Sequence, residues 1–405
     1  MRTICVAGKN DIAVDVMLHC LNHYCDYRIV CITNKNETGI NAWQKSLGWF
    51  AEENNVEIVS LDEVYEIEDL IFLSTEFDRI INPSKFKSEN LYNIHFSLLP
   101  KYKGCYTSVM PILNGETKTG VTFHKIRRGI DTGEIIDQEE IVIDESYTSY
   151  DLYERLIDLG TKVVIRNLDR IIDGNFELVS QSKQNSTYYS PKTINYSALE
   201  LDINSTAFQI QNQIRAFCFR PYQILKWGNN CFVHCEITDN ASQEKPGTML
   251  EENDIVTEIS TIDYDVILYK DNFERALKSI ESEDNYNAKR YCSCKEIINS
   301  KDSHGWSPLT VAVYNGNFDM VKFLLKNNAD YRVRNNNGTT LLMYAKDLGL
   351  ATGEWEIFKL LLGYGLDVVD KDYRNRSLLD YLESEDMNKI PSDIKRIIAG
   401  GGTRK

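Results

Sequence analysis

Two polar residues of the chain, Asn93 and His95, stand in the otherwise mostly apolar segment Asn-Ile-His-Phe-Ser-Leu-Leu-Pro. Side chains alternate along a β-strand, so this spacing places the amide and the imidazole on one face of a strand end. Such a pair suits acyl transfer, because an imidazole accepts a proton from an attacking amine while a carboxamide NH2 stabilises an oxyanion on a carbonyl. The same pattern also fits a polar pair that only satisfies its own hydrogen bonds at a strand end.

A carboxylate near the imidazole would orient the ring and stabilise its protonated form. Asp131 lies between Gly129 and Gly133 in a predicted turn and is the candidate for this role. Asp-Thr-Gly alone is a common turn sequence. The amide, the imidazole and the carboxylate together favour a catalytic site.

The segments that must position these residues alternate short β-branched runs with amphipathic stretches. We expect strands at residues 3–7, 28–33, 56–59 and 70–74, with helices at 12–20 and 40–54. This alternation is typical of βαβ units around a mostly parallel sheet. The first turn, residues 8–11, offers Lys9 and Asn10 to a phosphate at a strand end, or is a plain tight turn. It is not the Gly-x-Gly-x-x-Gly pattern of dinucleotide-binding folds, so a dinucleotide cofactor gains little support.

The pattern of predicted helices and strands changes twice after the segment that holds Asn93, His95 and Asp131. A helical pattern at residues 205–217 followed by β-like runs at 223–227 and 231–237 predicts a small β domain. Farther on, Gly-Trp-Ser-Pro-Leu around Leu309 is echoed by Gly-Thr-Thr-Leu-Leu around Leu342, 33 residues later, and a weaker copy follows around Leu379. This period resembles ankyrin repeats, each of which buries its apolar face against its neighbours. We therefore expect domains at residues 1–195, 196–258 and 259–399, with a disordered tail at 400–405.

Composition excludes several classes of protein. The 405 residues carry 45 Lys and Arg against 60 Asp and Glu, a net charge of −15, which disfavours a nucleic-acid substrate. No apolar run is long enough to span a bilayer and no signal peptide is visible, so we expect a cytoplasmic protein without a membrane partner. The 10 cysteines are too sparse for a disulfide scaffold, and the isolated pair Cys292 and Cys294 is a weak metal signal. We expect no bound metal.

Beyond Asn93, His95 and Asp131, several sequence blocks over roughly residues 1–240 resemble the folate-dependent formyltransferases in their order and spacing. The blocks are Asn93-x-His95-x-Ser97-Leu98-Leu99-Pro100, Lys103-Gly104, Gly115, Thr119-Gly120-Val121-Thr122 and Asp131-Thr132-Gly133. The resemblance implies a Rossmann-like α/β formyltransferase domain with a mostly parallel sheet, then a small β-containing domain, followed here by an all-α ankyrin stack.

The resemblance also implies the chemistry. Asn93, His95 and Asp131 would form the catalytic triad, and N10-formyltetrahydrofolate would be the formyl donor, with no metal. His95 would serve as general base, Asn93 would support the oxyanion, and Asp131 would fix His95 and help relay protons. The residues implied for the folate are Phe77, Arg79, Ile80, Ile81, Arg127, Gly129 and Asp131.

Three acceptor classes compete: initiator tRNA, glycinamide ribonucleotide and nucleotide-linked amino sugars. The acidic charge opposes tRNA, and a second domain would be superfluous for a minimal purine-pathway enzyme. The chain is most similar to the enzymes that act on dTDP-3-amino-3,6-dideoxyhexoses for bacterial O-antigen and lipopolysaccharide; a 4-amino sugar on dTDP or UDP is the alternative. The residues implied for the acceptor are Lys9, Asn10, Ser97, Lys103, Gly104 and Tyr222.

The repeats have two candidate roles. Ankyrin stacks usually bind proteins, and the chain would then be chiefly an interaction module if its formyltransferase half were inactive. Alternatively, aromatic faces beside arginines would hold a pyrimidine and a diphosphate. The residues of this possible second nucleotide site are Trp306, Tyr314, Arg332, Arg334 and Tyr344. A homodimer is the expected assembly.

Overall fold

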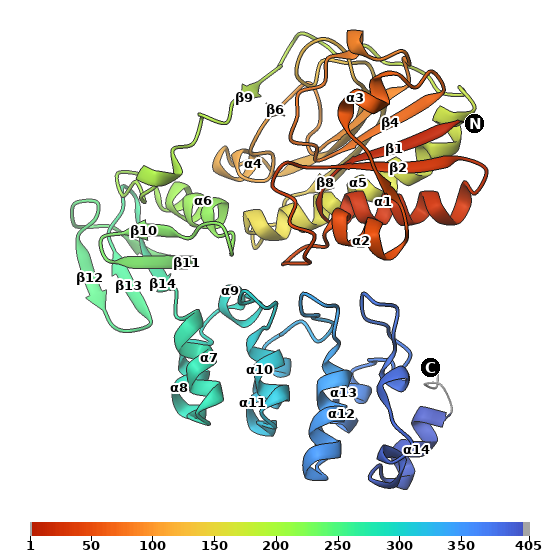
Figure 1. Ribbon diagram of the computed structural model, residues 1–405. Coiled ribbons are helices and arrows are strands. Elements are labelled where there is room, and N and C mark those ends of the chain that lie inside the picture. The colour runs from red at the N-terminus through yellow and green to blue at the C-terminus, as the bar shows by residue number, and fades with distance from the viewer. Residues whose placement is uncertain (1, 400–405) are drawn as a thin grey trace. The chain divides into compact units, whose positions relative to one another are not determined.

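The computed structural model describes residues 2–399, which divide into two compact units (Figure 1). The first unit runs to Phe219 and includes Gln223–Lys226; the second contains Arg220–Tyr222 and the chain from Trp227 onward. The tail predicted at residues 400–405 lies outside the described residues.

Seven strands of the described chain form the sheet of the first unit, in the order β3-β2-β1-β4-β5-β7-β8. Neighbouring strands are parallel up to β5, whereas β7 runs antiparallel to β5 and to β8. This mostly parallel sheet confirms the predicted α/β class. The strands are β1 (Thr3–Gly8), β2 (Arg28–Thr33), β3 (Glu57–Ile58), β4 (Leu70–Thr75), β5 (Leu91–His95), β7 (Lys118–Lys125) and β8 (Ile135–Val142).

The helices of the first unit pack on this sheet. The long helix α5 (Ser149–Ile172) begins with a capping box in which Thr148 and Asp151 bond each other's backbone. It packs against α1 (Asn10–His23) and β7, and a Cβ at Gly160 would come within 2.9 Å of the Phe96 ring, so glycine permits this close approach. The other helices are α2 (Leu47–Glu53), α3 (Leu61–Tyr65), α4 (Met110–Leu113) and α6 (Ala207–Phe217), with 3₁₀ turns at Pro83–Lys85 and Tyr196–Ala198.

The helix predicted at residues 40–54 is wrong in its first half, since α2 begins only at Leu47. The hydroxyl of Ser46 accepts the N–H of Trp49 and caps the helix. The backbone N–H of Ser46 is donated to Asn41, and its hydroxyl is donated to Glu37. These side-chain bonds replace the helical ones that a longer α2 would need.

Two segments that are distant in the sequence pair as short strands and fix the backbone that follows the end of β5. The two-residue strands β6 (Lys103–Gly104) and β9 (Tyr188–Tyr189) pair in parallel. The N–H of Tyr102 is also donated to the hydroxyl of Thr187 at 2.7 Å. Gly104 has φ +87°, and a Cβ there would lie 2.3 Å from the carbonyl oxygen of Tyr189. Glycine is therefore required at this contact.

The second unit begins with an antiparallel sheet in which the strands follow the order β11-β14-β13-β12. They are β11 (Asn230–Ala241), β12 (Met249–Glu252), β13 (Val256–Ile259) and β14 (Tyr264–Lys270). The boundary between the two units falls within β10 (Leu225–Trp227). Because the sheet continues through β14, the domain boundary predicted after residue 258 falls inside β13.

Pairs of short helices follow, and they confirm the predicted ankyrin stack. Ser307 and Thr340, 33 residues apart, cap the first helix of successive repeats by accepting the N–H groups of Thr310 and Met343. The third copy, after Ser377, forms only a 3₁₀ turn at Leu378–Tyr381. The helices are α7 (Phe273–Glu281), α8 (Asn285–Tyr291), α9 (Lys295–Ile298), α10 (Pro308–Tyr314), α11 (Phe318–Lys326), α12 (Leu341–Thr352), α13 (Glu356–Gly363) and α14 (Ser392–Ala399).

The turns of successive repeats stack closely. Gly305 and Gly338 both have positive φ, and a Cβ at either would lie under 3 Å from the backbone nitrogen of the next repeat's turn, at Asn336 and Tyr373 respectively. Each repeat therefore contacts its neighbour through backbone as well as through apolar side chains. No helix among the described residues is long and apolar enough to cross a membrane.

Candidate active site

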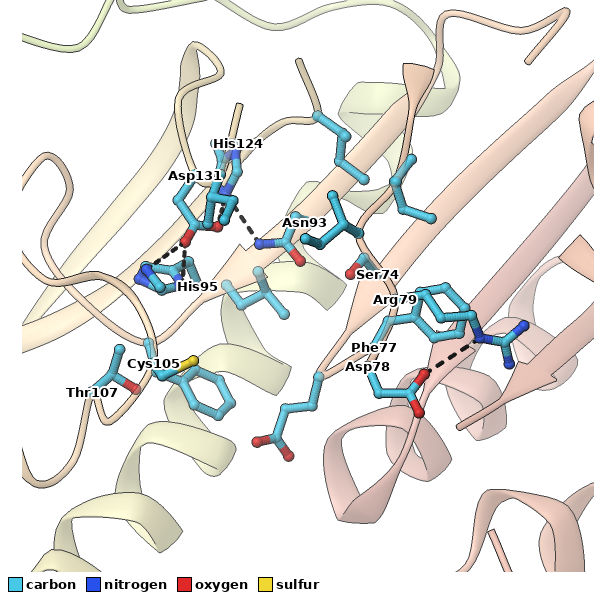
Figure 2. A pocket seen from close by; sticks show the side chains of 18 of the residues that line it. Ser74, Phe77, Asp78, Arg79, Asn93, His95, Cys105, Thr107, His124 and Asp131 are labelled. Carbon is cyan, nitrogen blue, oxygen red and sulfur yellow. Dashed lines mark hydrogen bonds and ion pairs between the residues drawn. The ribbon is translucent and has the colours of Figure 1, made fainter. Parts of the chain in front are cut away.

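A cavity of about 590 Å³ opens at the carboxyl ends of β4 and β5, the edge at which open α/β sheets bind ligands. The three predicted catalytic residues, Asn93, His95 and Asp131, all line it (Figure 2). The alternation of β5 brings the first two to the same face, as the spacing predicts. Asp131 reaches them from the loop between β7 and β8.

His95 lies between two acceptors. Its Nε2 is 2.8 Å from the carbonyl oxygen of Tyr102, and its Nδ1 is 3.5 Å from Oδ2 of Asp131. Because a carbonyl only accepts, Nε2 carries the hydrogen and the lone pair of neutral His95 is on Nδ1. Burial lowers the pKa of His95, and the charge of Asp131 opposes this shift only in part. The ring is therefore a neutral base near neutral pH, with a carboxylate beside the nitrogen that gains the proton.

Asp131 is held in an unusual backbone conformation, with φ +51°. Its Oδ2 accepts the N–H of Gly104 at 2.8 Å, and its carbonyl accepts the side-chain amide of Gln181 at 2.9 Å. Burial alone would raise the pKa of Asp131, but the charge of His95, the nearby His124 ring and the backbone N–H of Gly104 outweigh it and lower the pKa to about 2. The carboxylate is thus ionised at every pH at which an amine acceptor is reactive.

His124 belongs to this cluster, although the sequence analysis did not select it. Its Nε2 lies 3.1 Å from Nδ2 of Asn93 and 3.7 Å from Oδ1 of Asp131, and its Nδ1 lies 2.8 Å from the carbonyl oxygen of Lys125. Asn93 and His124 are directly paired across β5 and β7. The only signal in the sequence was a histidine two residues after the Thr119-Gly120-Val121-Thr122 block and seven residues before Asp131.

The residues predicted to hold the folate all line the cavity: Phe77, Arg79, Ile80, Ile81, Arg127, Gly129 and Asp131. The guanidinium of Arg79 lies 4.7 Å from the centre of the Phe77 ring and donates to the carbonyl of Thr33. Ile80 is 83% exposed at this wall. The wall therefore combines apolar surface with two cations, which fits a flat heteroaromatic ring that carries an acidic tail.

The residues predicted to hold the acceptor are not brought together as a set. Gly104 lines the cavity. Ser97 is fully buried, donates its hydroxyl to the carbonyl of Lys101 at 2.7 Å and does not line the cavity. Ser97 follows the end of β5, where the chain turns and the hydroxyl closes that turn. Lys103 does not line the cavity, and Tyr222 is exposed in the second unit.

The turn after β1 forms a polar network at the cavity wall. Nδ2 of Asn10 lies 3.1 Å from Glu76 and 2.8 Å from the hydroxyl of Tyr153, which itself donates to Glu76 at 2.6 Å. Burial raises the pKa of Glu76, whereas the charge of Lys9 and these two hydrogen bonds lower it in part. Lys9 and Asn10 therefore act on a cavity-lining carboxylate that the sequence analysis missed.

The residues predicted for a second nucleotide site fall into two groups in the repeats. The rings of Trp306, Tyr314 and Tyr344 form one cluster, with centres 4.9 to 6.0 Å apart. Arg332 and Arg334 instead line a separate cavity of about 370 Å³ together with two aspartates. Within the described residues, no group of three or more His, Cys, Asp or Glu side chains could hold a metal ion.

The buried position of His95 predicts the acid limb of the pH profile. Below its pKa the ring is protonated and cannot accept a proton, so kcat/KM should fall only at a pH below the ordinary histidine range. Asp131→Asn removes the charge that raises the pKa of His95, so this limb should move to still lower pH while the rate itself drops. Initial rates from about pH 5 to about pH 8 measure both effects. An acid limb that moves upward in Asp131→Asn would contradict the assigned contact.

Comparisons with known proteins place this geometry among formyl-transferring enzymes. A family model described as formyl transferase matches residues 52–168, and one described as ankyrin repeats in three copies matches residues 280–372. Methionyl-tRNA formyltransferase of Thermotoga maritima is 36% identical over 182 residues, 42% of this chain and 58% of that protein. The chain spans 52% to 66% of the length of the first curated relatives it matches.

Two solved structures are more similar and are covered almost completely. The N-formyltransferase from Helicobacter canadensis, solved with folinic acid and dTDP-3-aminofucose, is 41% identical with a TM-score of 0.62, covering 67% of this chain and 100% of that one. WlaRD, a sugar 3N-formyl transferase solved with dTDP and 5-N-formyl-THF, is 44% identical with a TM-score of 0.62, covering 67% of this chain and 98% of that one.

Proposed function

This chain belongs to the sugar N-formyltransferases and carries C-terminal ankyrin repeats, and from that premise we propose its reaction. It transfers a formyl group from N10-formyltetrahydrofolate to the amino group of a dTDP-linked sugar, dTDP-3-amino-3,6-dideoxy-D-glucose. The product serves bacterial O-antigen and lipopolysaccharide synthesis in the cytoplasm, and the enzyme acts as a homodimer. The observation that carries the proposal is the buried contact of His95 with Asp131 beside Asn93, in one cavity with the predicted folate wall.

The chain's own groups supply the base and the charge stabilisation. The donor contributes an electrophilic formyl carbon. Nδ1 of His95 takes the proton that the attacking amine must lose, because its Nε2 hydrogen is committed to the carbonyl of Tyr102. The imidazolium that results lies against the ionised Asp131. The NH2 of Asn93 donates to the oxyanion that develops on the formyl oxygen. When this tetrahedral intermediate collapses, the bond between the formyl carbon and N10 breaks, and the protonated His95 returns its proton to N10 of the leaving tetrahydrofolate.

The acceptor class follows from charge and from the relatives. A net charge of −15 opposes a tRNA, which separates this chain from the methionyl-tRNA enzymes it also resembles. The Helicobacter canadensis enzyme was solved with dTDP-3-aminofucose, and WlaRD is described as a sugar 3N-formyl transferase. Both descriptions favour a 3-amino sugar as the acceptor. Lys9 and Asn10, at the turn after β1, are our candidates for the diphosphate.

A mass-spectrometric screen tests this proposal. Purified enzyme and formyl donor are incubated with dTDP- and UDP-linked 3-amino and 4-amino sugars, and each product is examined for the mass gain of one CO. We expect the 3-amino dTDP sugars to react with the highest kcat/KM. Faster turnover of a 4-amino sugar would contradict the proposed acceptor and identify the 4-amino sugar as the substrate. No turnover of any sugar, together with one stoichiometric protein partner, would favour the interaction module.

The aromatic cluster Trp306, Tyr314 and Tyr344 supports a second nucleotide-sugar site in the repeats. Tyr314 is 54% exposed although its ring meets those of Trp306 and Tyr344 in tilted and edge-on contacts, so part of its aromatic surface is open to a pyrimidine. We expect calorimetry on the full chain to give two dTDP-sugar sites in the wild type and one in Trp306→Ala. Tyr286→Ala, which removes an exposed tyrosine from α8, is the control and should keep both sites. One site in the wild type would leave protein binding as the role of the repeats.

A further inference from the structure

We propose that His124 is a positioning residue that sets which end of the Asn93 carboxamide faces the reacting formyl group. The inference rests on the proposed function and concerns a residue that the triad does not include. Its basis is a chain of two contacts, from the carbonyl of Lys125 to the imidazole of His124 and from that imidazole to the amide of Asn93 (Figure 2 shows the second).

The tautomer of His124 follows from its first contact. Nδ1 lies 2.8 Å from the carbonyl oxygen of Lys125, and this oxygen can only accept, so Nδ1 carries the hydrogen. His124 is buried, and both ring nitrogens have a protein partner. The neutral ring therefore presents a lone pair at Nε2.

The orientation of Asn93 follows from that lone pair. The amide group that faces Nε2 at 3.1 Å has to be the donor NH2, because the amide oxygen would meet a second lone pair there. One hydrogen of Nδ2 is donated to His124, and the other remains for an oxyanion in the cavity that Asn93 lines. A rotation of the amide by half a turn would instead present oxygen to the developing negative charge. His124 thus selects the productive rotamer.

The contacts of Asp131 are consistent with this assignment. Nε2 of His124 is 3.7 Å from Oδ1, too far for a hydrogen bond, whereas Nδ1 of His95 approaches Oδ2 more closely. With a lone pair at Nε2, His124 has no hydrogen there to donate to the carboxylate. The charge of Asp131 then remains available to His95.

Two variants separate positioning from structural support. In His124→Leu no acceptor faces Asn93, and we expect kcat to fall at least about tenfold while KM for both substrates changes little. In His124→Gln the amide oxygen can accept from Asn93, and most of kcat should return. Thermal unfolding of both variants shows whether they fold. Equal losses in the two variants would overturn the proposal, and so would wild-type kcat in His124→Leu.

A double-mutant cycle with Asn93→Ala makes the test specific. If His124 acts through Asn93, adding His124→Leu to Asn93→Ala should lower kcat by less than about twofold. Additive losses would mean that His124 acts by another route.

Selective ¹⁵N labelling of histidine keeps the inference testable even if no amino sugar is turned over. The His124 resonances are assigned by their loss in His124→Gln. We expect the Nδ1-protonated neutral tautomer, and an Nε2-protonated tautomer would overturn the proposal. Failure of the sugar screen with the expected tautomer would refute the proposed acceptor and leave the amide contact standing.

Discussion

Replacement of His95 by Asn should lower kcat for formyl transfer by about a thousandfold. The shorter asparagine amide reaches the position of Nδ1 and not that of Nε2, so the hydrogen bond to the carbonyl of Tyr102 is lost as well, and thermal unfolding must show that the variant folds. What disappears is a neutral nitrogen lone pair next to Asp131. Steady-state rates at saturating donor and acceptor measure the loss, and KM should change little because the ring serves as a base rather than as a binding group.

The matched control is His304→Asn, since that side chain is 79% exposed on a turn of the repeats. It should retain wild-type kcat. Normal turnover by His95→Asn would remove the general base from the mechanism and would point to solvent or to another group as the proton acceptor.

Asn93→Asp is expected to lower kcat by about as much as His95→Asn, but for a different physical reason. The change is nearly isosteric but replaces the NH2 donor by a carboxylate oxygen, so a negative charge would face the developing oxyanion. It would also lie next to His124, which now accepts from the amide at 3.1 Å. We expect kcat to fall about a thousandfold, and Asn93→Ala, which removes the donor without adding charge, to fall about a hundredfold.

The ratio between these two variants separates the lost hydrogen bond from the added charge. Asn175→Asp, which adds the same charge at an exposed position of the same unit, should leave kcat unchanged. If Asn93→Asp and Asn93→Ala were equally impaired, repulsion of the oxyanion would play no part. If both were fully active, the amide would have no role in the reaction.

The parts of the site that could be predicted from sequence are those set by local geometry. Asn93 and His95 share a face because side chains on a strand alternate, and this needs no knowledge of the rest of the fold. Asp131 was found because two glycines mark its turn. His124 was missed because its place depends on which strand pairs with β5, a contact between segments about thirty residues apart that alternation does not reveal.

Other differences arise from side chains that bond to the backbone. Ser97 carries a hydroxyl of the right type at the right end of a strand, yet it closes a turn by donating to Lys101. Asn41 and Glu37 similarly accept hydrogen bonds from Ser46, which helical periodicity placed inside a helix at residues 40–54. The repeats were easier to predict, because one repeat folds against the next through the same local capping at Ser307 and Thr340.

The pairing of β5 with β7 has a consequence for how this site tolerates change. Asn93 faces His124 and His95 faces Thr122 in one antiparallel ladder, so both sides of the reaction centre share a single register. A slip of one residue would turn His124 to the opposite face of the sheet and bring Phe123 or Lys125 opposite Asn93. Insertions between the two strands can be absorbed in the connecting loops, whereas a single deletion within β7 would exchange the imidazole for a benzyl or ammonium group without altering any residue of the triad.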